Sequence, residues 1–582
     1  MKAKKTIQEL KPYPVPLFEE EGFLKLDSNE NDFGPSVKVM EVLRSVEQSD
    51  VQYYPYYGKL LQKLADFHGV GIDNVILTCG ADEAISAIFG AFLEYGSTVL
   101  TVTPSFIMPK IYAKINGLSY REISYGKKWE FPVEEFIQNI DEKVDLVHLT
   151  TPNSPTGEVI SAEVIQSVVE ACEACETVQN VKQKAILIDE TYGNYSGASS
   201  LGLIKDYDNV FVVRSFSKDF ALAGLRLGYV LSDSKNIKHL RKYLSPYNVS
   251  TITVKAGMAA LEDVEHFKNV RLLVEESKKV LTAGLEELGA KVYSSTTNFV
   301  CADFGAKADF IYHKLLLNKI KVRYFNHAPM LENTMRIAVP TMENTLRVLE
   351  VIKNRQTIVF DMDGVLVDAS KSYRVAVQKT FTHFSGKEVS KEELSAVKKL
   401  GGLNNDWDLT EFLLKQQGLK VEKDDIVSVF QSHYAELADV EAMLVEKSFF
   451  EKLSMNYNLA IFTGRLKKEA HYTLEKNEVL KYFYPIITLD DVGLDRQKPD
   501  SLGIEMVKEK IITNKIYYLG DTVDDMICAK SSCVCGIGVL PPQDKSEELS
   551  ELLKSENAMV VLDQTVELES FLNIKEVENA SK

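Results

Sequence analysis

Ser215-Phe216-Ser217-Lys218 is followed by Gly224-Leu225-Arg226-Leu227-Gly228, and a second cassette, Asp361-Met362-Asp363-Gly364-Val365, lies further along the same chain. Each cassette comes directly after a short apolar, β-branched run. A lysine nucleophile suits amino-group chemistry, whereas paired aspartates suit the hydrolysis of a phosphate ester. Because these chemistries seldom share a polypeptide, their pairing indicates action on one metabolite or on adjacent metabolites of a pathway.

Length and charge narrow the class of protein further. With 582 residues the chain is too long for one hydrophobic core, so we expect several domains. A net charge of -17 argues against a nucleic-acid partner, and no apolar run of about 18 residues predicts a membrane span. The seven cysteines, an odd number, indicate no disulfide framework. We therefore expect a cytoplasmic protein without a membrane or nucleic-acid partner.

The first part of the chain alternates short β-branched runs with longer amphipathic stretches. This pattern predicts an α/β fold with a mainly parallel sheet, in which ligands bind at the carboxyl ends of the strands. Residues 250–280 are predicted to form one long helix that leads into a smaller α/β subdomain. The predicted strands are Val75–Thr78, Ser97–Val102, Leu146–Leu149, Ala185–Ile188, Val210–Val213 and Gly228–Leu231.

The α/β pattern starts again at Thr357–Phe360. A charged and mostly helical insert over about residues 370–452 follows, and the pattern then resumes. No Gly/Ser tether lies near Asn354-Arg355-Gln356, so the domains are expected to pack together rather than to be loosely strung. The later predicted strands are Leu459–Phe462, Pro485–Leu489 and Ile516–Leu519.

Lys218 needs an electron sink, and pyridoxal phosphate is the cofactor that supplies one to a lysine nucleophile. The helix opening at Gly80-Ala81-Asp82-Glu83 offers free N–H groups to its phosphate, with Ala81 and Asp82 as cofactor contacts. Asp189 can keep the pyridine nitrogen protonated, and Tyr192 can reach the ring hydroxyl. Further candidate cofactor contacts are Ser215, Ser217 and Arg226 around the phosphate and Phe106 on the ring face.

Taken singly, each of these features has a plainer explanation, such as surface polarity or a helix cap. Seven blocks in one order resemble the fold-type I aminotransferases, and over roughly residues 10–353 the histidinol-phosphate aminotransferases in particular. The blocks are Ser28-Asn29-Glu30-Asn31, Tyr54-Pro55, Gly80-Ala81-Asp82-Glu83, Pro152-Asn153-Ser154-Pro155-Thr156-Gly157, Ile188-Asp189-Glu190-Thr191-Tyr192, Ser215–Lys218 and Met335-Arg336-Ile337.

The resemblance implies an aminotransferase over residues 1–353, with a large domain at about 35–250 and a small domain formed by the N-terminal arm and about 265–353. It implies a homodimer in which Tyr54 reaches the partner's cofactor phosphate, and an amino donor such as glutamate. Arg336 would pair with the substrate carboxylate or its counterpart, Arg323 would lie near the substrate's far end, and Asn29 would also contact the substrate.

One position departs from the family pattern. The family usually has Asn-Pro-Thr-Gly, in which the asparagine donates to the cofactor hydroxyl, but Ser154 occupies that place here. Serine is shorter, so either Asn153 substitutes for it or Tyr192 holds the oxygen alone. We interpret the change as a shift in the tuning of the cofactor or in the substrate, and not as a loss of activity, because Lys218 and Asp189 remain.

Hydrolysis of a phosphate ester needs a nucleophile, a proton donor and cations. Asp361 is the candidate nucleophile, and Asp363, which a tight turn can aim into the same pocket, is the candidate acid and base. Thr463 can hydrogen-bond the phosphoryl oxygens, and Lys498 can neutralise Asp361 and the phosphate. Asp521 is a candidate Mg²⁺ ligand, with Asp525 as an additional metal residue.

This set resembles the haloacid dehalogenase superfamily, phosphatase type, from about residue 356 to the end of the chain. The spacing resembles members with a helical cap after the first strand, such as phosphoglycolate phosphatase and β-phosphoglucomutase relatives. The resemblance implies a Mg²⁺ site that also includes Asp361 and Asp363, and Arg465 as a substrate contact. Substrate choice is expected in the cap, around residues 399–407, where Trp407 either packs in the core or stacks on the substrate.

Three functions remain open. The first is a bifunctional enzyme that transaminates a phosphorylated keto compound and then removes the phosphate. If the resemblance is literal, imidazole acetol phosphate would become histidinol phosphate and then histidinol. The second is a specialised-metabolite transaminase joined to a phosphatase for a different small phosphate ester, which Ser154 favours. The third is a fusion in which one domain binds its ligand for regulation without turnover.

Overall fold

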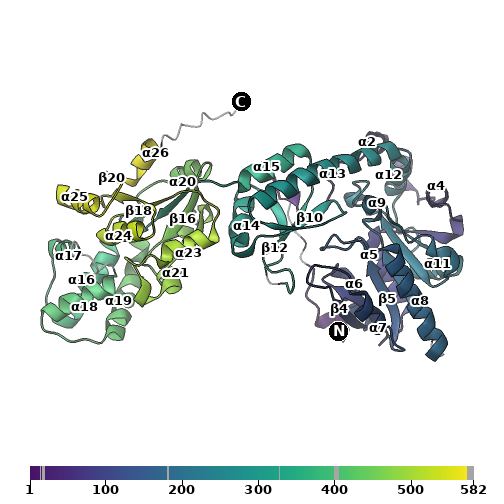
Figure 1. Cartoon of the computed structure of the whole chain (residues 1–582), viewed down its shortest axis with the longest axis horizontal. Helices are drawn as coiled ribbons and strands as arrows, with labels where there is room; N and C mark the ends of the chain where they lie inside the picture. The colour runs from purple at the N-terminus through teal and green to yellow at the C-terminus, as the bar shows by residue number, and fades with distance from the viewer. Residues whose placement is uncertain are drawn as a thin grey trace. The chain divides into compact units, whose positions relative to one another are not determined.

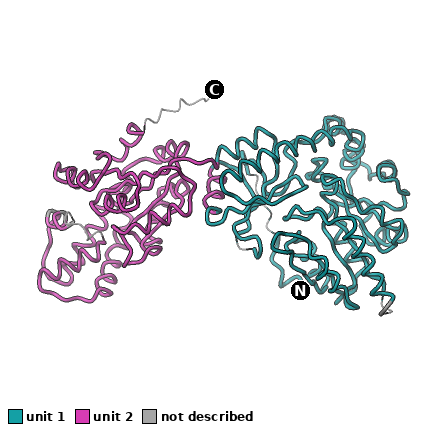
Figure 2. Tube along the Cα trace, viewed as in Figure 1, with its two compact units in different colours: residues 1–308, 318–351 teal, residues 309–317, 352–582 magenta. Residues whose placement is uncertain are grey.

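The computed structural model describes residues 1–13, 15, 17, 20–179, 182–326, 328–398 and 405–572. By its internal contacts the chain divides into two compact units, coloured teal and magenta in Figure 2. The first unit holds residues 1–308 and 318–351, and the second holds residues 309–317 and 352–582. Within the described residues, no helix has both the length and the apolar character that a membrane span requires.

A seven-stranded sheet forms the centre of the first unit, and helices cover both of its faces (Figure 1). Its inner strands are buried over most of their length, and their apolar side chains contribute to two apolar clusters. The strands in spatial order are β2 (Val75–Thr78), β8 (Gly228–Ser232), β7 (Val210–Ser215), β6 (Ala185–Asp189), β5 (Val144–Thr150), β3 (Thr98–Thr103) and β4 (Ser119–Ser124).

The sheet confirms the predicted α/β class and adds two details. Strand β8 runs antiparallel to both of its neighbours, and the other pairings are parallel. Strand β4 was not predicted, because it is a polar edge strand without the apolar run of the inner strands. The helices of this part of the first unit include α2 (Val37–Arg44), α4 (Gly58–His68), α5 (Gly80–Phe92), α6 (Met108–Asn116), α7 (Val133–Gln138), α8 (Ala162–Gln179) and α11 (Ser234–Tyr243).

The long helix predicted over 250–280 was wrong, because two helices occupy the segment. Helix α12 (Thr251–Leu261) ends before Asp263, and α13 (Val264–Glu287) begins after it. Asp263 leaves helical geometry with φ at -126°, and its carboxylate accepts a hydrogen bond from Ser36. This contact with a distant part of the chain accompanies the break, and the local sequence did not reveal it.

A second, five-stranded sheet completes the first unit. The N-terminal arm takes part in it, because β1 pairs in parallel with β11. The helices of the first unit next to this sheet in Figure 1 are α13 and α15 (Met342–Ile352). Helix α14 (Ala308–Leu317) lies between β10 and β11 in the sequence, and its residues 309–317 group with the second unit. The strands in order are β1 (Leu24–Leu26), β11 (Ile320–Tyr324), β12 (Thr334–Ala338), β10 (Phe299–Asp303) and β9 (Lys291–Tyr293).

The second unit contains a six-stranded parallel sheet, and helices lie around this sheet (Figure 1). Strand β17 starts before the predicted Pro485, and it stops before Thr488 because that residue caps the short helix α22 (Leu489–Val492). The strands in order are β17 (Phe483–Ile487), β16 (Asn458–Phe462), β13 (Thr357–Phe360), β18 (Ile516–Gly520), β19 (Cys535–Val539) and β20 (Val560–Leu562). Its helices include α20 (Lys447–Ser454), α21 (Lys467–Lys476), α23 (Leu502–Lys510), α24 (Val523–Ser531) and α25 (Glu547–Ser555).

A helical insert leaves the sheet through β14 (Val367–Asp368) and returns through β15 (Ala442–Met443), and these two short strands pair with each other. The insert has its own apolar cluster, to which Trp407 and Phe430 belong. By contrast, Phe449 and Phe450 of α20 pack in the core of the six-stranded sheet. The insert helices are α16 (Tyr373–Ser385), α17 (Lys391–Lys398), α18 (Asp406–Gln416) and α19 (Lys423–Leu437), and the expected specificity stretch 399–404 lies outside the described residues.

Candidate active sites

The turn from β2 into α5 offers an anion site in the first unit. Gly80 begins α5 with φ at +76°, a backbone conformation that favours glycine. A Cβ at Gly80 would lie 2.5 Å from Nη2 of Arg226, and one at Gly228 would lie 2.5 Å from the carbonyl carbon of Gly80. The glycines therefore let a guanidinium approach the free N–H groups at the start of the helix, where Ala81 and Asp82 lie. This set of donors fits a phosphate group.

Arg226 holds its place at this turn through an ion pair. Its Nη2 lies 3.0 Å from Oδ2 of Asp82, and both side chains are partly exposed, at 44% and 39%. The two predicted serines are buried beside it, where Ser215 Oγ accepts the Ser217 N–H at 3.1 Å. Arg226 itself has φ at +54°, an uncommon value for a non-glycine residue.

Lys218 and its neighbour Asp219 are held by the N-terminal arm. The Lys218 amine donates to the Ser28 carbonyl at 2.7 Å, and the Asn31 amide donates to the Lys218 carbonyl at 3.0 Å. The arm and the strand end at β7 thus meet although they are far apart in the sequence. The amine is only partly buried, so a ligand can approach it.

Asp189 ends β6 as a buried carboxylate. Its Oδ1 accepts hydrogen bonds from the backbone N–H and the hydroxyl of Thr191, at 3.0 Å and 2.7 Å. Burial raises the pKa of Asp189 to about 6 in spite of these two donors. A cation beside this carboxylate would offset the effect of burial, and a protonated pyridine ring is such a cation. The residue therefore fits the expected cofactor.

The structure bears on the two alternatives that Ser154 left open. The Asn153 amide donates to the Pro104 carbonyl at 3.0 Å and to the Thr156 hydroxyl at 2.9 Å, so its donors are used within the loop. The Tyr192 hydroxyl instead accepts a hydrogen bond from the Asn29 amide at 2.8 Å. This arrangement favours Tyr192, held by Asn29, as the group that meets the cofactor hydroxyl.

Two arginines lie directly opposite each other on β11 and β12. The register pairs Arg323 with Arg336, so both side chains leave the same face of the sheet. Arg336 donates to Ser154 Oγ at 2.9 Å and to the Asp27 carbonyl at 2.6 Å, while its buried Nε has no partner. Like charges placed opposite each other are unfavourable on their own. An anionic ligand between the two guanidinium groups would remove that repulsion.

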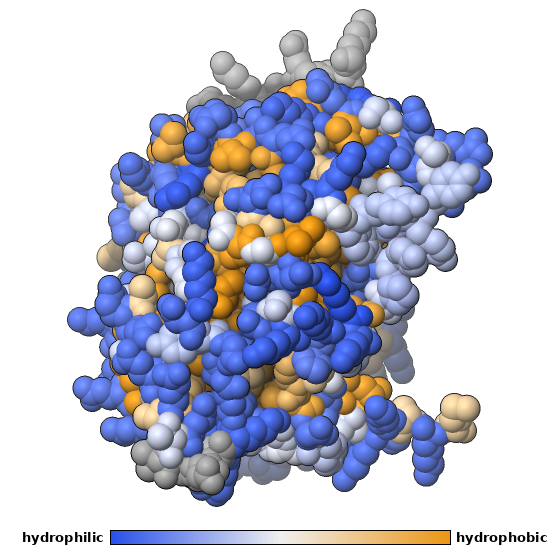
Figure 3. Space-filling view, turned by 90° about the vertical axis from the view of Figure 1, so that its right-hand side faces the viewer, coloured by the Kyte–Doolittle hydropathy of each residue, from blue (hydrophilic) through white to orange (hydrophobic). Residues whose placement is uncertain are grey.

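The remaining predicted contacts of the first unit lie towards its surface. Tyr54 is 73% exposed and its ring stacks on Tyr247 at 4.4 Å, whereas Phe106 is half-buried. Val51, Tyr53 and Tyr56 are exposed as well. Figure 3, which views the first unit from the right-hand side of Figure 1, shows apolar orange groups among the blue polar surface. Among the described residues, no hydrogen bond or ion pair joins the Tyr54 side chain to the candidate phosphate site.

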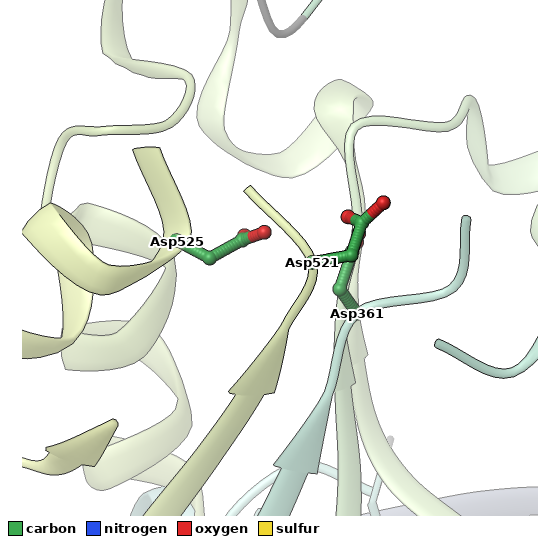
Figure 4. A group of neighbouring side chains, drawn as sticks. All are labelled: Asp361, Asp521 and Asp525. Carbon is green, nitrogen blue, oxygen red and sulfur yellow. The ribbon is translucent and has the colours of Figure 1, made fainter. Parts of the chain in front are cut away.

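In the second unit, three aspartates converge at the carboxyl edge of the sheet (Figure 4). Asp361 follows β13, Asp521 follows β18, and Asp525 comes from the first turn of α24. One carboxylate oxygen of each lies within 4.8 Å of the others, and all three residues are buried. Carboxylate oxygens at such spacing suit a hard divalent cation such as Mg²⁺. Among the described residues Asp363 does not join this group.

Lys498 lies between two of these carboxylates. Its amine is 2.7 Å from Asp361 and 2.8 Å from Asp525, and all three side chains are nearly inaccessible to solvent. Burial raises the pKa of Asp361 to about 7 although Lys498 opposes the shift, while Lys498 holds the pKa of Asp525 below its usual value against the effect of burial. One ammonium contacts two of the three clustered carboxylates, so the cluster can accept further positive charge.

Gly364 allows this cluster to close. Its φ is +79°, and a Cβ there would lie only 2.2 Å from Oδ2 of Asp521. The turn after β13 can therefore approach the turn after β18 only with glycine at this position. This is a physical reason for the glycine in the Asp-Met-Asp-Gly cassette.

Thr463 and Arg465 follow β16, the neighbouring strand. Thr463 is buried beside Lys498, and its Oγ1 accepts the Arg465 N–H at 3.2 Å. The predicted substrate contact Arg465 is fully buried, and its guanidinium pairs with Asp363 at 2.6 Å and with Glu441 at 2.8 Å. Whether Arg465 also contacts a substrate stays a prediction.

A pocket joins the aspartates to the helical insert. Asp361, Asp363 and Asp521 line it from the sheet, while Trp407 and other aromatic residues line it from the insert. Trp407 thus packs in the core of the insert and also borders the pocket. Asp406, which also lines the pocket, lies in the stretch 399–407 where substrate choice was expected. Four further lining residues were not predicted, because they belong to none of the quoted motifs; they are Tyr373, Arg374, Phe430 and Glu469.

Comparisons with known proteins agree with these two sites. Residues 21–352 match the model of the family described as aminotransferase class I and II, and residues 358–539 match that of haloacid dehalogenase-like hydrolase. The chain is 33% identical over 352 residues to histidinol-phosphate aminotransferase 1 of Carboxydothermus hydrogenoformans, covering 60% of this chain and 96% of that protein. It is 32% identical over 323 residues to a histidinol-phosphate aminotransferase of Thermoanaerobacter, covering 55% and 89%.

Among solved structures, the chain is similar to histidinol-phosphate aminotransferase from Sinorhizobium meliloti in complex with pyridoxal-5'-phosphate. The identity is 25%, the TM-score is 0.53, and the match covers 60% of this chain and 95% of that one. The predicted resemblances and the predicted fold class are thereby confirmed. The chain belongs to the aminotransferase class I and II family, and a haloacid dehalogenase-like hydrolase domain follows its aminotransferase domain.

Proposed function

We propose that the chain is a bifunctional enzyme that transaminates a phosphorylated keto compound and hydrolyses a phosphate monoester. The facing arginines Arg323 and Arg336 are the observation that carries the link between the two activities. They suit a doubly charged phosphate on the substrate of the first unit, and the cluster around Asp361 suits a phosphate in the second. A phosphorylated metabolite that both units act on is the simplest explanation for the arginine pair in the first unit and the cluster in the second.

In the first unit, the cofactor that the family implies is pyridoxal phosphate, which would supply the electron sink. The helix start at Gly80 and Arg226 would hold its phosphate, and Asp189 would keep its ring nitrogen protonated. Tyr192 would hold its hydroxyl. Lys218 would move the proton at the substrate carbon that gains or loses the amino group, with an amino donor such as glutamate.

In the second unit, Asp361 would attack phosphorus while the bond from phosphorus to the ester oxygen breaks. Asp363 would give its proton to that oxygen, and the alcohol would leave. Asp363 would then accept a proton from water as the water attacks the phosphorylated Asp361, which regenerates the carboxylate and releases phosphate. Lys498 and Thr463 would hold the phosphoryl oxygens, and Mg²⁺ held by Asp361, Asp521 and Asp525 would offset their charge.

The specific proposal is the conversion of imidazole acetol phosphate to histidinol phosphate and then to histidinol. The similarity to two proteins named histidinol-phosphate aminotransferase, at 33% and 32% identity, supports it. We also propose a homodimer in which Tyr54 reaches the partner's cofactor. The exposed aromatic side chains around Tyr54 support an interface there.

The test uses the purified full chain loaded with pyridoxal phosphate and Mg²⁺. With glutamate and imidazole acetol phosphate we expect 2-oxoglutarate, and then histidinol and inorganic phosphate in equal amounts. Arg323→Leu should raise KM for the phosphorylated ketone and leave KM for glutamate nearly unchanged, and Arg241→Leu, at an exposed ion pair with Asp73, is the matched control. Absence of histidinol phosphate and of histidinol would reject the specific proposal.

The alternative is a transaminase for another metabolite with a phosphatase for a different small ester. Ser154 favours it, because the group that contacts Arg336 there differs from the family's asparagine. A panel of keto acids and small phosphate esters, assayed on the same preparation, separates the two. Fast turnover of an ester that is not an amino alcohol phosphate would support the alternative.

A further inference from the structure

Arg465 links two parts of the second unit through one guanidinium group. On one side, its Nε lies 3.2 Å from each carboxylate oxygen of Asp363, and its Nη2 lies 2.6 Å from Oδ1 of the same residue. Arg465 is completely buried, whereas the Asp363 side chain keeps 35% of its surface exposed and lines the pocket. A rigid, planar donor therefore fixes a carboxylate that faces the substrate space.

On the other side, the same guanidinium holds Glu441. Its Nη1 donates to Glu441 Oε2 at 2.8 Å, and its Nη2 donates to Oε1 at 3.0 Å. Glu441 is buried next to β15, the strand through which the insert returns to the sheet. The Ser372 hydroxyl, at the start of the insert, donates to Glu441 at 2.8 Å, and so does the Tyr434 hydroxyl of α19 at 3.3 Å.

The insert also covers the guanidinium directly. The ring of Tyr373, in the first turn of α16, lies 4.7 Å from the central carbon of Arg465. The Tyr373 hydroxyl donates to Glu469 of α21 at 2.5 Å. The positive charge is thus enclosed by two carboxylates and an aromatic face, and water is excluded from it.

We propose that Arg465 is a positioning residue for Asp363, and that Glu441 anchors it from the insert. This inference rests on the proposed phosphatase activity, in which Asp363 serves the ester oxygen. A buried guanidinium that bridges two carboxylates keeps its orientation only while both are present, since loss of either leaves buried charge uncompensated. The position of the acid and base carboxyl is thereby tied to the position of the insert over the pocket.

A simple structural role predicts something different. If Arg465 only stabilised the fold, its replacement would slow the hydrolysis of every ester alike. If it positions Asp363, the loss depends on how much the leaving oxygen needs a proton. An alkoxide leaving group needs one, whereas p-nitrophenolate is stable as an anion and hardly does.

The experiment measures the rate of the first step alone, the release of the alcohol or phenol in a single turnover by excess full chain with Mg²⁺, because Asp363 serves the later attack of water with every ester alike. The two esters are p-nitrophenyl phosphate and histidinol phosphate or, failing that, the fastest alkyl phosphate of a small panel. Arg465→Lys keeps the charge but loses the planar fork. We expect a loss of about 10²-fold or more on the alkyl ester, and less than about tenfold on p-nitrophenyl phosphate. Asp363→Asn should likewise lose more activity on the alkyl ester than on p-nitrophenyl phosphate. The double variant with Arg465→Lys and Asp363→Asn should be no slower than Asp363→Asn alone.

Thr473→Val is the matched control, because within the described part of the chain the Thr473 hydroxyl hydrogen-bonds to Arg465 and Glu441 in this buried cluster but not to Asp363. We expect equal, small losses on the two esters. If Arg465→Lys does not fold, Glu441→Gln takes its place in the test. We then expect the loss on the alkyl ester to exceed the loss on p-nitrophenyl phosphate by about tenfold.

Equal losses on both esters in a folded Arg465 or Glu441 variant would overturn this inference but leave the proposed phosphatase activity standing. Losses that multiply in the double variant with Asp363→Asn would overturn it too. A wild-type chain that releases phosphate from neither ester would reject the proposed phosphatase and the inference with it.

Discussion

The two candidate sites hold their charges in opposite ways. In the first unit, the Arg226–Asp82 pair is partly exposed to solvent, and the Lys218 amine is held by the carbonyl oxygen of Ser28. In the second unit, Lys498, Asp361 and Asp525 are buried against one another. The first arrangement fits an organic cofactor that brings its own charges. The second is a compact pocket whose charges depend on one another and on a small cation.

This difference has an energetic consequence. Solvent screens the exposed pair, so its net contribution to stability is small. The buried cluster lies in a medium of low dielectric constant, where loss of one member leaves its partners uncompensated. The chemistry of the first site should therefore be separable from folding, whereas the chemistry of the second should not.

The largest expected effect is a selective loss of one activity. Lys218→Ala should lower transamination, and Asp361→Asn should lower phosphate release, each by about 10⁴-fold or more. Each variant should keep the other activity, because the two sets of residues lie in separate units. Assays of both reactions on both variants check this, and loss of both activities from either substitution would contradict the separation.

The next effect tests the energetic contrast directly. Lys498→Met should lower the free energy of unfolding of the second unit by about 3–5 kcal/mol, because it leaves Asp361 and Asp525 buried without their cation. Arg226→Met should cost the first unit less than about 1 kcal/mol, because its ion pair is exposed. Urea unfolding, followed by probes for each unit, measures both. Similar losses in the two variants would remove the contrast.

A smaller effect concerns pH. The pKa of Asp361 is raised from 3.8 to about 7 by burial, and that of Asp189 from 3.8 to about 6. Above pH 4 the unfolded carboxyls are ionised while the folded ones keep protons, so the folded state binds more protons and stability falls as pH rises. This decrease should extend to about pH 7 in the second unit and to about pH 6 in the first.

Bound cations should oppose this decrease. We expect Mg²⁺ to raise the melting temperature of the second unit more at pH 7 than at pH 5. Pyridoxal phosphate should likewise raise the melting temperature of the first unit more at about pH 6 than at lower pH. Asp361→Asn should remove most of the Mg²⁺ effect and leave that of the cofactor. An equal shift by Mg²⁺ at both pH values would show that Asp361 is not the group involved.

The smallest effect belongs to Ser154. Ser154→Asn restores the family residue beside Tyr192 and Arg336, and we expect transamination to change by less than about tenfold. The pH at which the bound cofactor changes its absorbance should shift, because a second donor would then reach its hydroxyl. The matched variant Asn29→Ala removes the group that holds Tyr192. If neither substitution moves the absorbance, neither residue acts on the cofactor hydroxyl.

Much of this molecule followed from local sequence. Short apolar runs predicted the strands that carry the cassettes, because buried parallel strands need apolar residues on both faces. Residues directly after such strands gather at one edge of a sheet, so Asp361, Asp521 and Thr463 could be placed from their spacing alone. The ends of elements were less certain where a cap decides them, as at Thr488.

Only the tertiary structure decided which distant groups meet. It brought Asn29 to Tyr192, set Arg323 opposite Arg336, and paired Arg465 with Glu441 of the insert return. It also broke the helix predicted over 250–280 at Asp263. A sequence pattern reports what a residue does to its own segment, through backbone preference and periodic burial. Charge compensation and hydrogen bonding between segments depend on packing, and no local pattern encodes them.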